Sequence, residues 1–290
     1  MTRDATDIRQ RLATAMKQAS FRWAGSDLDL LPDSGLAHTH VRLVGHGALA
    51  RIPKQSQMDL APEANLAYQA ACFERASPMT DLLAEIETQA AWLDAAQIDA
   101  RARRAIDAEI ARYRALCALS PRPPQSLISF DAHPGNFMVR ADGRAVLVDL
   151  EKCRYSHASL DLAHATLYTS TTWGPASNTA LGVDEVAGAY ADWSREMGPS
   201  AAAWQDWHLP LRRAMWLWSI TWCAKWRVAS TAASAATAAG EDWSSQLSEP
   251  DLIADVRGRV DHYLSAPVVE HVLGEIDALA GAMPKLNEPS

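Results

Sequence analysis

The apolar residues of this chain recur mainly at the spacing of helices. Near the start, Ile8 and Leu12 belong to one stripe of a helix that we expect within residues 1–20. Residues 80–118 carry two further stripes, which predict two helices with a break between them. The segment "SPRPPQ" at 120–125 ends this region, because proline removes a backbone donor and fixes φ.

Two short stretches between residues 26 and 54 are strand-like. The pieces "HVRLV" and "ALARI" are separated by Gly45-His46-Gly47, which predicts a hairpin. Pro62 then favours the first turn of a helix, "PEANLAYQAACFERA". After about residue 160 the pattern is again helical, and the small-residue segment 230–245 predicts a loop or a frayed helix end. We therefore expect an α+β fold, with a small mixed N-terminal part and a larger, mainly helical part.

A second hairpin is predicted within "SFDAHPGNFMVRADGRAVLVDLEKC", residues 129–153. Asp142-Gly143 is a strong signal for a two-residue type I′ turn. With that turn, Asn136 lies directly opposite Asp149 on the same face of the hairpin, with Cβ atoms about 4.5–5.5 Å apart. The inferred hairpin thus brings an amide oxygen and a carboxylate to one place.

This pair of oxygen ligands suits Mg²⁺, which binds one or two protein carboxylates together with waters and substrate phosphates. Asp131 lies five residues before Asn136 and is placed to orient a hydroxyl group and accept its proton. The alternative from spacing alone is a surface hairpin, with Asp131 in a turn and Asn136 in a left-handed bend. Both interpretations stay open at this point.

Composition excludes several classes of function. The net charge of −8 argues against nucleic acid as a partner, since phosphate backbones need clustered Lys and Arg. The four cysteines contain no Cys-x-x-Cys pair, and the first residues lack an apolar signal segment, so a reducing cytoplasm is the expected location. The most apolar segment, "AMWLWSITWCA", is about half the roughly 20 residues of a membrane span, so we expect no membrane partner.

Two further groups of residues are candidates for ligand sites. His38, His40 and His46 have no acidic or Cys partner nearby in sequence, so metal binding is the weaker interpretation. Trp218 and Trp222, with Trp226, recur at helical spacing, which is more typical of a core stripe. The alternative is an aromatic surface that holds a cationic substrate through cation–π contacts.

The pieces "FDAHPGNFMV", "VLVDLEKC" and "SLDLA" resemble the aminoglycoside phosphotransferase and choline kinase-like family, relatives of the protein kinases. The resemblance implies a protein-kinase-like two-lobed fold, and ATP and Mg²⁺ as cofactors. It implies Asp131 as the catalytic base and Asn136 and Asp149 as the metal ligands, with Asp161 as a structural support. The sequence departs from the family pattern just before Asp131, where Ser129 and Phe130 replace the usual His and Gly.

The N-terminal residues resemble the small lobe of that family. The resemblance implies Gly35 in the loop over the phosphates and Arg51, or Lys54, on the α- and β-phosphates, with Glu63 pairing with that base. We expect a shortened N-terminal lobe over 1–78 and a helical C-terminal lobe over 79–290, because there is no room for the usual two further strands and hinge.

Two functions follow from these expectations. The first is a kinase that phosphorylates a hydroxyl of a small polar or cationic metabolite or an aminoglycoside-like compound. The alternative is a catalytically impaired kinase-like protein that binds a metabolite or a protein partner, because the strands of the adenine site are missing. A shortened lobe would also leave an exposed sheet edge, which a homodimer could cover.

Overall fold

A computed structural model describes residues 5–31, 38–46, 48–53, 77–119, 122–150, 152–174, 178–230 and 250–283. These residues form two compact units. Unit 1 contains the described residues up to 53, and unit 2 contains those from 77 onward. The predicted boundary after residue 78 adjoins residues 54–76, which lie outside the described residues, so it stays a prediction.

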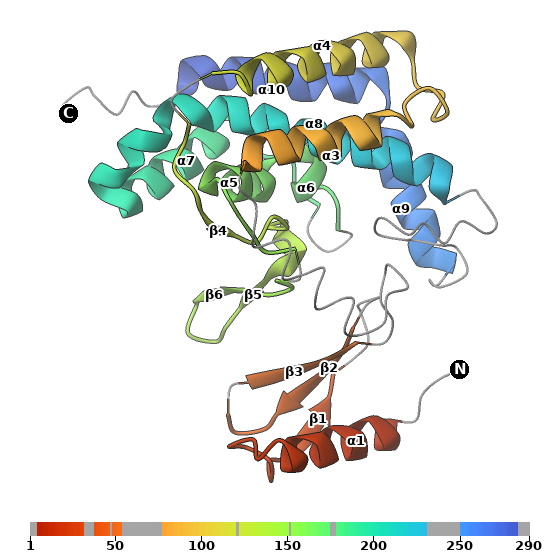
Figure 1. Ribbon diagram of the computed structural model, residues 1–290, viewed down its shortest axis with the longest axis vertical. Coiled ribbons are helices and arrows are strands. Elements are labelled where there is room, and N and C mark those ends of the chain that lie inside the picture. Colours follow the sequence, from red (N-terminus) through yellow and green to blue (C-terminus); the bar gives the residue numbers. More distant parts are fainter. Residues whose placement is uncertain are drawn as a thin grey trace. The chain divides into compact units, whose positions relative to one another are not determined.

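Unit 1 combines one helix with a small antiparallel sheet (Figure 1). Helix α1 spans Ala5–Gln18, and the sheet has the order β1 (Leu28–Leu30), β2 (His38–Leu43) and β3 (Ala48–Pro53). Strands β2 and β3 form the hairpin expected from the sequence, with Val41 opposite Ala50. The helix predicted from Pro62 lies outside the described residues.

Helices dominate unit 2. The first two are α3 (Pro78–Ala90) and α4 (Ala100–Leu116), and they confirm the predicted break between two helices. Proline at the start of α3 and Asp99 as the N-cap of α4 mark their beginnings; the Asp99 side chain accepts a hydrogen bond from Arg101 N at 2.7 Å. The helices that follow residue 157 are α5 (Ala158–Thr166), α6 (Tyr168–Thr171), α7 (Val183–Met197), α8 (His208–Ala229), α9 (Pro250–Tyr263) and α10 (Ala266–Ala282), with the 3-10 segment η2 (Gly198–Trp207) before α8.

Helix α8 is the centre of unit 2. It packs against α3, α4, α5, α9 and α10, and it is apolar around most of its circumference, as expected for a helix enclosed by others (Figure 1). Arg212, within α8, is fully buried and forms an ion pair with Glu275 at 2.6 Å and a hydrogen bond to Thr166 Oγ1 at 2.7 Å. This pairing satisfies a charge that would otherwise be costly to bury.

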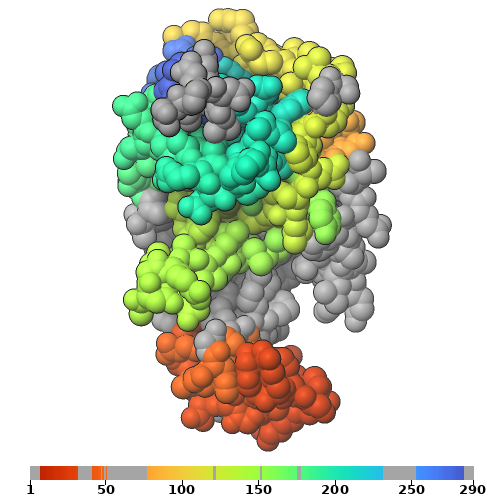
Figure 2. Space-filling view, turned by 90° about the vertical axis from the view of Figure 1, so that its left-hand side faces the viewer, coloured from red at the N-terminus to blue at the C-terminus, as the bar shows by residue number. Residues whose placement is uncertain are grey.

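Two short antiparallel pairs of strands lie beside the helices of unit 2. Strand β4 (Ser126–Ile128) pairs with β7 (Arg154–Ser156), and β5 (Phe137–Val139) pairs with β6 (Ala145–Leu147). The β5–β6 hairpin lies at the surface of unit 2, where it is light green in Figure 2, and Val139 is 73% exposed. The protein is therefore α+β, as predicted. Among the described residues, no helix has both the length and the apolar character needed to cross a membrane.

Candidate active site

The loop that carries Asp131 is held by hydrogen bonds from its own backbone. It runs from β4 to the 3-10 turn η1 (Pro134–Asn136). The Asp161 carboxylate of α5 accepts hydrogen bonds from Ser129 N at 2.7 Å and Phe130 N at 2.8 Å. The Ser129 hydroxyl in turn accepts one from Asp131 N at 3.1 Å. Asp161 thus occupies the supporting position that the resemblance implies for it.

Asp131 is paired with a cation inside this loop region. Lys152 Nζ lies 3.2 Å from Asp131 Oδ2, and the two side chains are only 23% and 16% exposed. Burial pushes the pKa of Asp131 upward, but Lys152, together with His164 and His133, outweighs it, so the pKa lies below its ordinary value. Asp131 is therefore ionised at neutral pH and can accept a hydrogen bond or a proton.

Asn136 is fixed directly beside Asp131. It is 8% exposed, and its Nδ2 donates a hydrogen bond to the Asp131 carbonyl oxygen at 2.8 Å. Because the amide nitrogen is used in this way, the side-chain oxygen Oδ1 is the atom left to act as a ligand. Asp131 and Asn136 are thus locked into one short segment.

The predicted register of the β5–β6 hairpin is wrong by one residue. Phe137 pairs with Leu147, and Val148 N donates to Asn136 O at 2.8 Å, so Val148 rather than Asp149 stands opposite Asn136. A type I′ turn needs positive φ at both central residues, but of Asp142 and Gly143 only Gly143 has it, at +80°. The turn instead spans one more residue, with Gly143 N bonded to Arg140 O at 2.9 Å and Arg144 N bonded to the Asp142 carboxylate at 3.1 Å.

Asp149 nevertheless remains close to the loop. Its φ of +61° lies in the left-handed region, which changes the direction of the chain just after β6. Its negative charge acts on His133, together with that of Asp131: burial lowers the pKa of His133, and the two carboxylates oppose that shift. Asp131 and Asp149 are therefore both within electrostatic reach of the His133 imidazole.

A comparison with protein families agrees with this arrangement. The profile described as "Phosphotransferase enzyme family" matches residues 44–199, which is more than half of the chain. The chain belongs to the phosphotransferase enzyme family. The resemblance to aminoglycoside phosphotransferases and choline kinases is thereby confirmed. A search of curated proteins found no match.

The residues that the resemblance assigns to nucleotide binding are described only in part. Arg51 lies in β3, opposite His40 of β2, and its side chain is outside the described residues. Gly35, Lys54 and Glu63 also lie outside them, so the roles implied for these four residues stay predictions.

Lys152 and His164 are site residues that sequence reasoning did not identify as such. Lys152 follows Asp149 by three residues, and nothing in its spacing indicates that it turns back to Asp131. His164 is buried, its ring centroid lies 6.3 Å from that of His133, and burial lowers its pKa to about 4. Its imidazole is therefore neutral at physiological pH.

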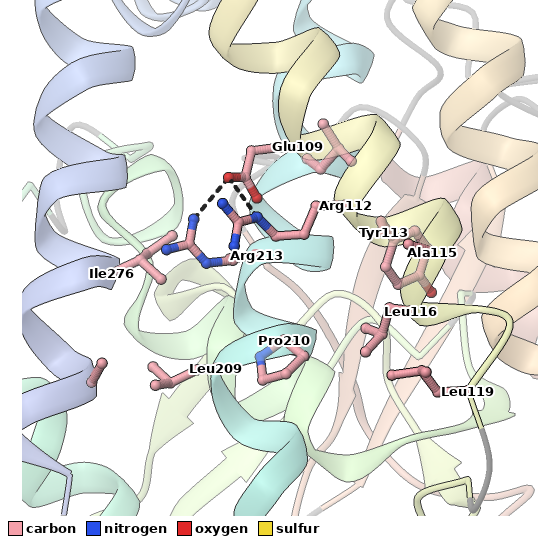
Figure 3. A pocket seen from close by; sticks show the side chains of 12 residues that line it. Glu109, Arg112, Tyr113, Ala115, Leu116, Leu119, Leu209, Pro210, Arg213 and Ile276 are labelled. Carbon is pink, nitrogen blue, oxygen red and sulfur yellow. Dashed lines mark hydrogen bonds and ion pairs between the residues drawn. The ribbon is translucent and has the colours of Figure 1, made fainter.

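A separate cavity lies between α4, the start of α8 and α10 (Figure 3). Its volume is about 450 Å³, and its walls are mostly apolar, including Leu116, Leu209 and Ile276. At one end, Glu109 forms an ion pair with Arg213, with Oε1 2.9 Å from Nη1. The residues that line this cavity include none of the predicted site residues. Within the described ranges, no group of three or more His, Cys, Asp or Glu side chains is arranged to hold a metal by itself.

Proposed function

We propose that this chain is an ATP- and Mg²⁺-dependent phosphotransferase that phosphorylates a hydroxyl group of a small polar or cationic molecule. The observation that carries the proposal is the ionised, largely buried Asp131, fixed beside Asn136 and paired with Lys152 at 3.2 Å. A carboxylate held in this way can orient an attacking hydroxyl and take its proton. The family match supports phosphoryl transfer as the reaction class.

Asn136 and Asp149 are the proposed ligands of Mg²⁺. The fit rests on donor chemistry, because both supply hard oxygen atoms and the Asn136 nitrogen is already bonded to Asp131 O. When bound, the metal would neutralise charge on the phosphates. Two protein ligands are enough for Mg²⁺, which completes its coordination with waters and phosphate oxygens.

The protein's own residues have distinct tasks in this proposal. Asp131 orients the acceptor hydroxyl and receives its proton, and Lys152 keeps that carboxylate ionised. Arg51 or Lys54, supported by Glu63, would bind the phosphates of the donor beneath the loop of Gly35, in a kinase-like pair of lobes. Positioning and charge neutralisation account for most of the catalysis in such a mechanism.

Thermal unfolding with and without Mg²⁺·ATP tests the proposal. At a nucleotide concentration about one hundred times Kd, binding adds about 2.7 kcal/mol, which raises Tm by several degrees. We expect this rise to require Mg²⁺ and to disappear in Asp149→Ala. The matched control is Asp142→Ala, which removes a carboxylate from the exposed turn of the same hairpin. Its Tm will drop slightly, but its response to Mg²⁺·ATP should remain.

A second candidate is a kinase-like protein without turnover that binds a metabolite or a partner. The observation in its favour is the short distance along the chain between β3, which ends at Pro53, and α3, which begins at Pro78. A kinase-like lobe needs a helix and two further strands in that interval. No change in Tm at millimolar Mg²⁺·ATP would favour this candidate. A thermal shift accompanied by ATP consumption with a panel of hydroxylated compounds would reject it.

A further inference from the structure

Phe130, directly before Asp131, has an unusual backbone conformation. Its φ is +57°, in the left-handed region that bulky side chains rarely adopt, and its side chain is 1% exposed. Such a conformation is strained and persists only where surrounding contacts enforce it. The contacts around this ring are therefore the place to look for a function.

Two side chains from separate elements lie against the Phe130 ring, and a third side chain joins those two. The Arg154 guanidinium of β7 lies over its face, with Cζ 3.8 Å from the ring centroid. Trp218 of α8 meets it edge to face, with centroids 5.1 Å apart and planes at 79°. Glu85 of α3 joins the two, because it accepts from Arg154 Nη1 at 2.8 Å and from Trp218 Nε1 at 3.1 Å. We call Glu85, Phe130, Arg154 and Trp218 the Phe130 clamp.

The clamp is mostly buried, which strengthens each of its contacts. Arg154 is 6% exposed, and the Glu85 side chain is 26% exposed. A desolvated cation–π contact is stronger than an exposed one, so the contact between Arg154 and Phe130 helps to hold the left-handed conformation. The carboxylate of Glu85 holds Arg154 and Trp218 together, so neither can leave the ring without losing a second interaction.

From these contacts we infer that the Phe130 clamp is a positioning device for Asp131. The backbone direction at residue 130 determines where the next side chain points, and the amides of Ser129 and Phe130 are simultaneously bound by Asp161. A displacement of about 1 Å at a reacting group can reduce a rate about 10²-fold. Phe130, Arg154, Glu85 and Trp218 thus act through Asp131 and do not contact substrate in this scheme.

Hydrogen exchange at the loop amides tests the inference directly. The main variant is Glu85→Gln/Arg154→Met, which removes both charges together and leaves no unpaired buried ion. A glutamine at 85 can still accept from Trp218. We expect the amides of residues 129–131 to exchange at least about tenfold faster than in the wild type, while α4 and α10 keep their protection. Unchanged exchange at these amides would overturn the inference.

The matched control is Glu87→Gln/Arg114→Met. This pair also joins α3 to a neighbouring element, with N and O 2.7 Å apart, but does not touch Phe130. It should leave exchange at 129–131 as in the wild type. If the main variant lost protection throughout unit 2, the variant Phe130→Leu would be used to test the inference. It keeps an apolar side chain and all the hydrogen bonds but lacks the aromatic face. Wild-type exchange at its loop amides would then reject the clamp.

Turnover provides the second readout and rests on the proposed function. With water as the acceptor for Mg²⁺·ATP, the main variant should lose about 10–100-fold in kcat with little change in KM for the nucleotide. Arg154→Lys, which keeps the charge, should recover part of that loss. Equal losses in the Glu87→Gln/Arg114→Met control would show that the effect is general destabilisation and reject positioning. A wild type that turns over neither with water nor with the panel of hydroxylated compounds would contradict the proposed function, and the exchange result would still decide the inference.

Discussion

Lys152 controls the charge of the carboxylate proposed as the catalytic base. Burial raises the pKa of Asp131, and Lys152 and the neighbouring histidines together lower it by more than burial raises it. Because the resulting pKa is below the ordinary value, Asp131 stays ionised as the pH falls toward that lowered pKa, and its ion pair is lost only below it. Without Lys152, burial would dominate and the pKa would rise.

We therefore expect Lys152→Met to move the acid limb of the pH–rate profile to higher pH. At pH 7, kcat/KM should fall about tenfold, a modest part of the roughly 10²–10⁴-fold that a general base supplies. Lys152→Arg should restore the position of the limb, because it restores the charge. Turnover of Mg²⁺·ATP between pH 5 and 8 measures this. Identical acid limbs in Lys152→Met and the wild type would show that Lys152 does not control the ionisation of Asp131.

The residues of the candidate site could be predicted only where a local motif carries them. Asp131, Asn136 and Asp149 stand at fixed spacings in one short segment, so the sequence alone could propose them as site residues, and their roles stay predictions. Lys152 and Arg154 reach the same region through side-chain directions that depend on tertiary packing. The spacing of residues along the chain does not predict these contacts.

The elements of unit 2 were more predictable than their exact pairing. Helices α3 and α4 were expected from their apolar stripes, and the break between them was expected as well. The β5–β6 hairpin was also expected, but its register was not. The Asp142 side chain accepts from Arg144 N, which stabilises a longer turn, and a change of one residue in the turn moves every cross-strand partner.

The tryptophans of α8 are divided between core and partly exposed positions. Trp216 and Trp226 are buried, which agrees with the core interpretation. Trp218 is half-buried and belongs to the Phe130 clamp. Trp222 is also half-buried and meets Trp173 edge to face, with centroids 5.7 Å apart. The stripe is therefore not uniform, and Trp222 is the member that best separates packing from ligand binding.

For Trp222→Ala we expect a loss of stability as the main effect. Removing a half-buried indole and its aromatic contact should cost about 2–4 kcal/mol, near the lower end of the range for large aromatic truncations. Chemical denaturation measures this difference. Full stability combined with loss of turnover on an identified cationic acceptor would instead assign Trp222 to the substrate site. Trp226→Ala, at a buried position of the same stripe, is the control for a pure packing loss.

For the whole chain, the sequence predicted the family and the α+β character. The residue roles predicted for the N-terminal lobe stay predictions, because these residues lie wholly or partly outside the described residues. The described sheet of unit 1 has β1 and β3 at its edges. An exposed edge of this kind was the reason for expecting a homodimer, which stays a prediction. Lys54 and Glu63, which the family resemblance assigns to the nucleotide side, lie between β3 and α3 and outside the described residues.

The stability of the whole protein should depend on pH through its buried imidazoles, most strongly through His164 and His208. Burial lowers the pKa of both His164 and His208 to about 4. His208 Nδ1 lies 2.9 Å from Ser159 Oγ, and the rings of Tyr190 and Trp193 pack against it. The ordinary pKa is 6.5, so between pH 6.5 and 4 the unfolded chain binds more protons than the folded protein.

Stability must therefore fall as the pH is lowered through this window, by at most about 1.4 kcal/mol per pH unit for each histidine. In His208→Gln the contribution of His208 is absent, and the glutamine can still bond to Ser159. Its free energy of unfolding should thus decline less steeply between pH 6.5 and 4 than that of the wild type, while the two slopes agree above pH 7. Urea denaturation at a series of pH values measures both slopes. Equal slopes below pH 6.5 would mean that His208 is protonated as readily in the folded protein as in the unfolded chain.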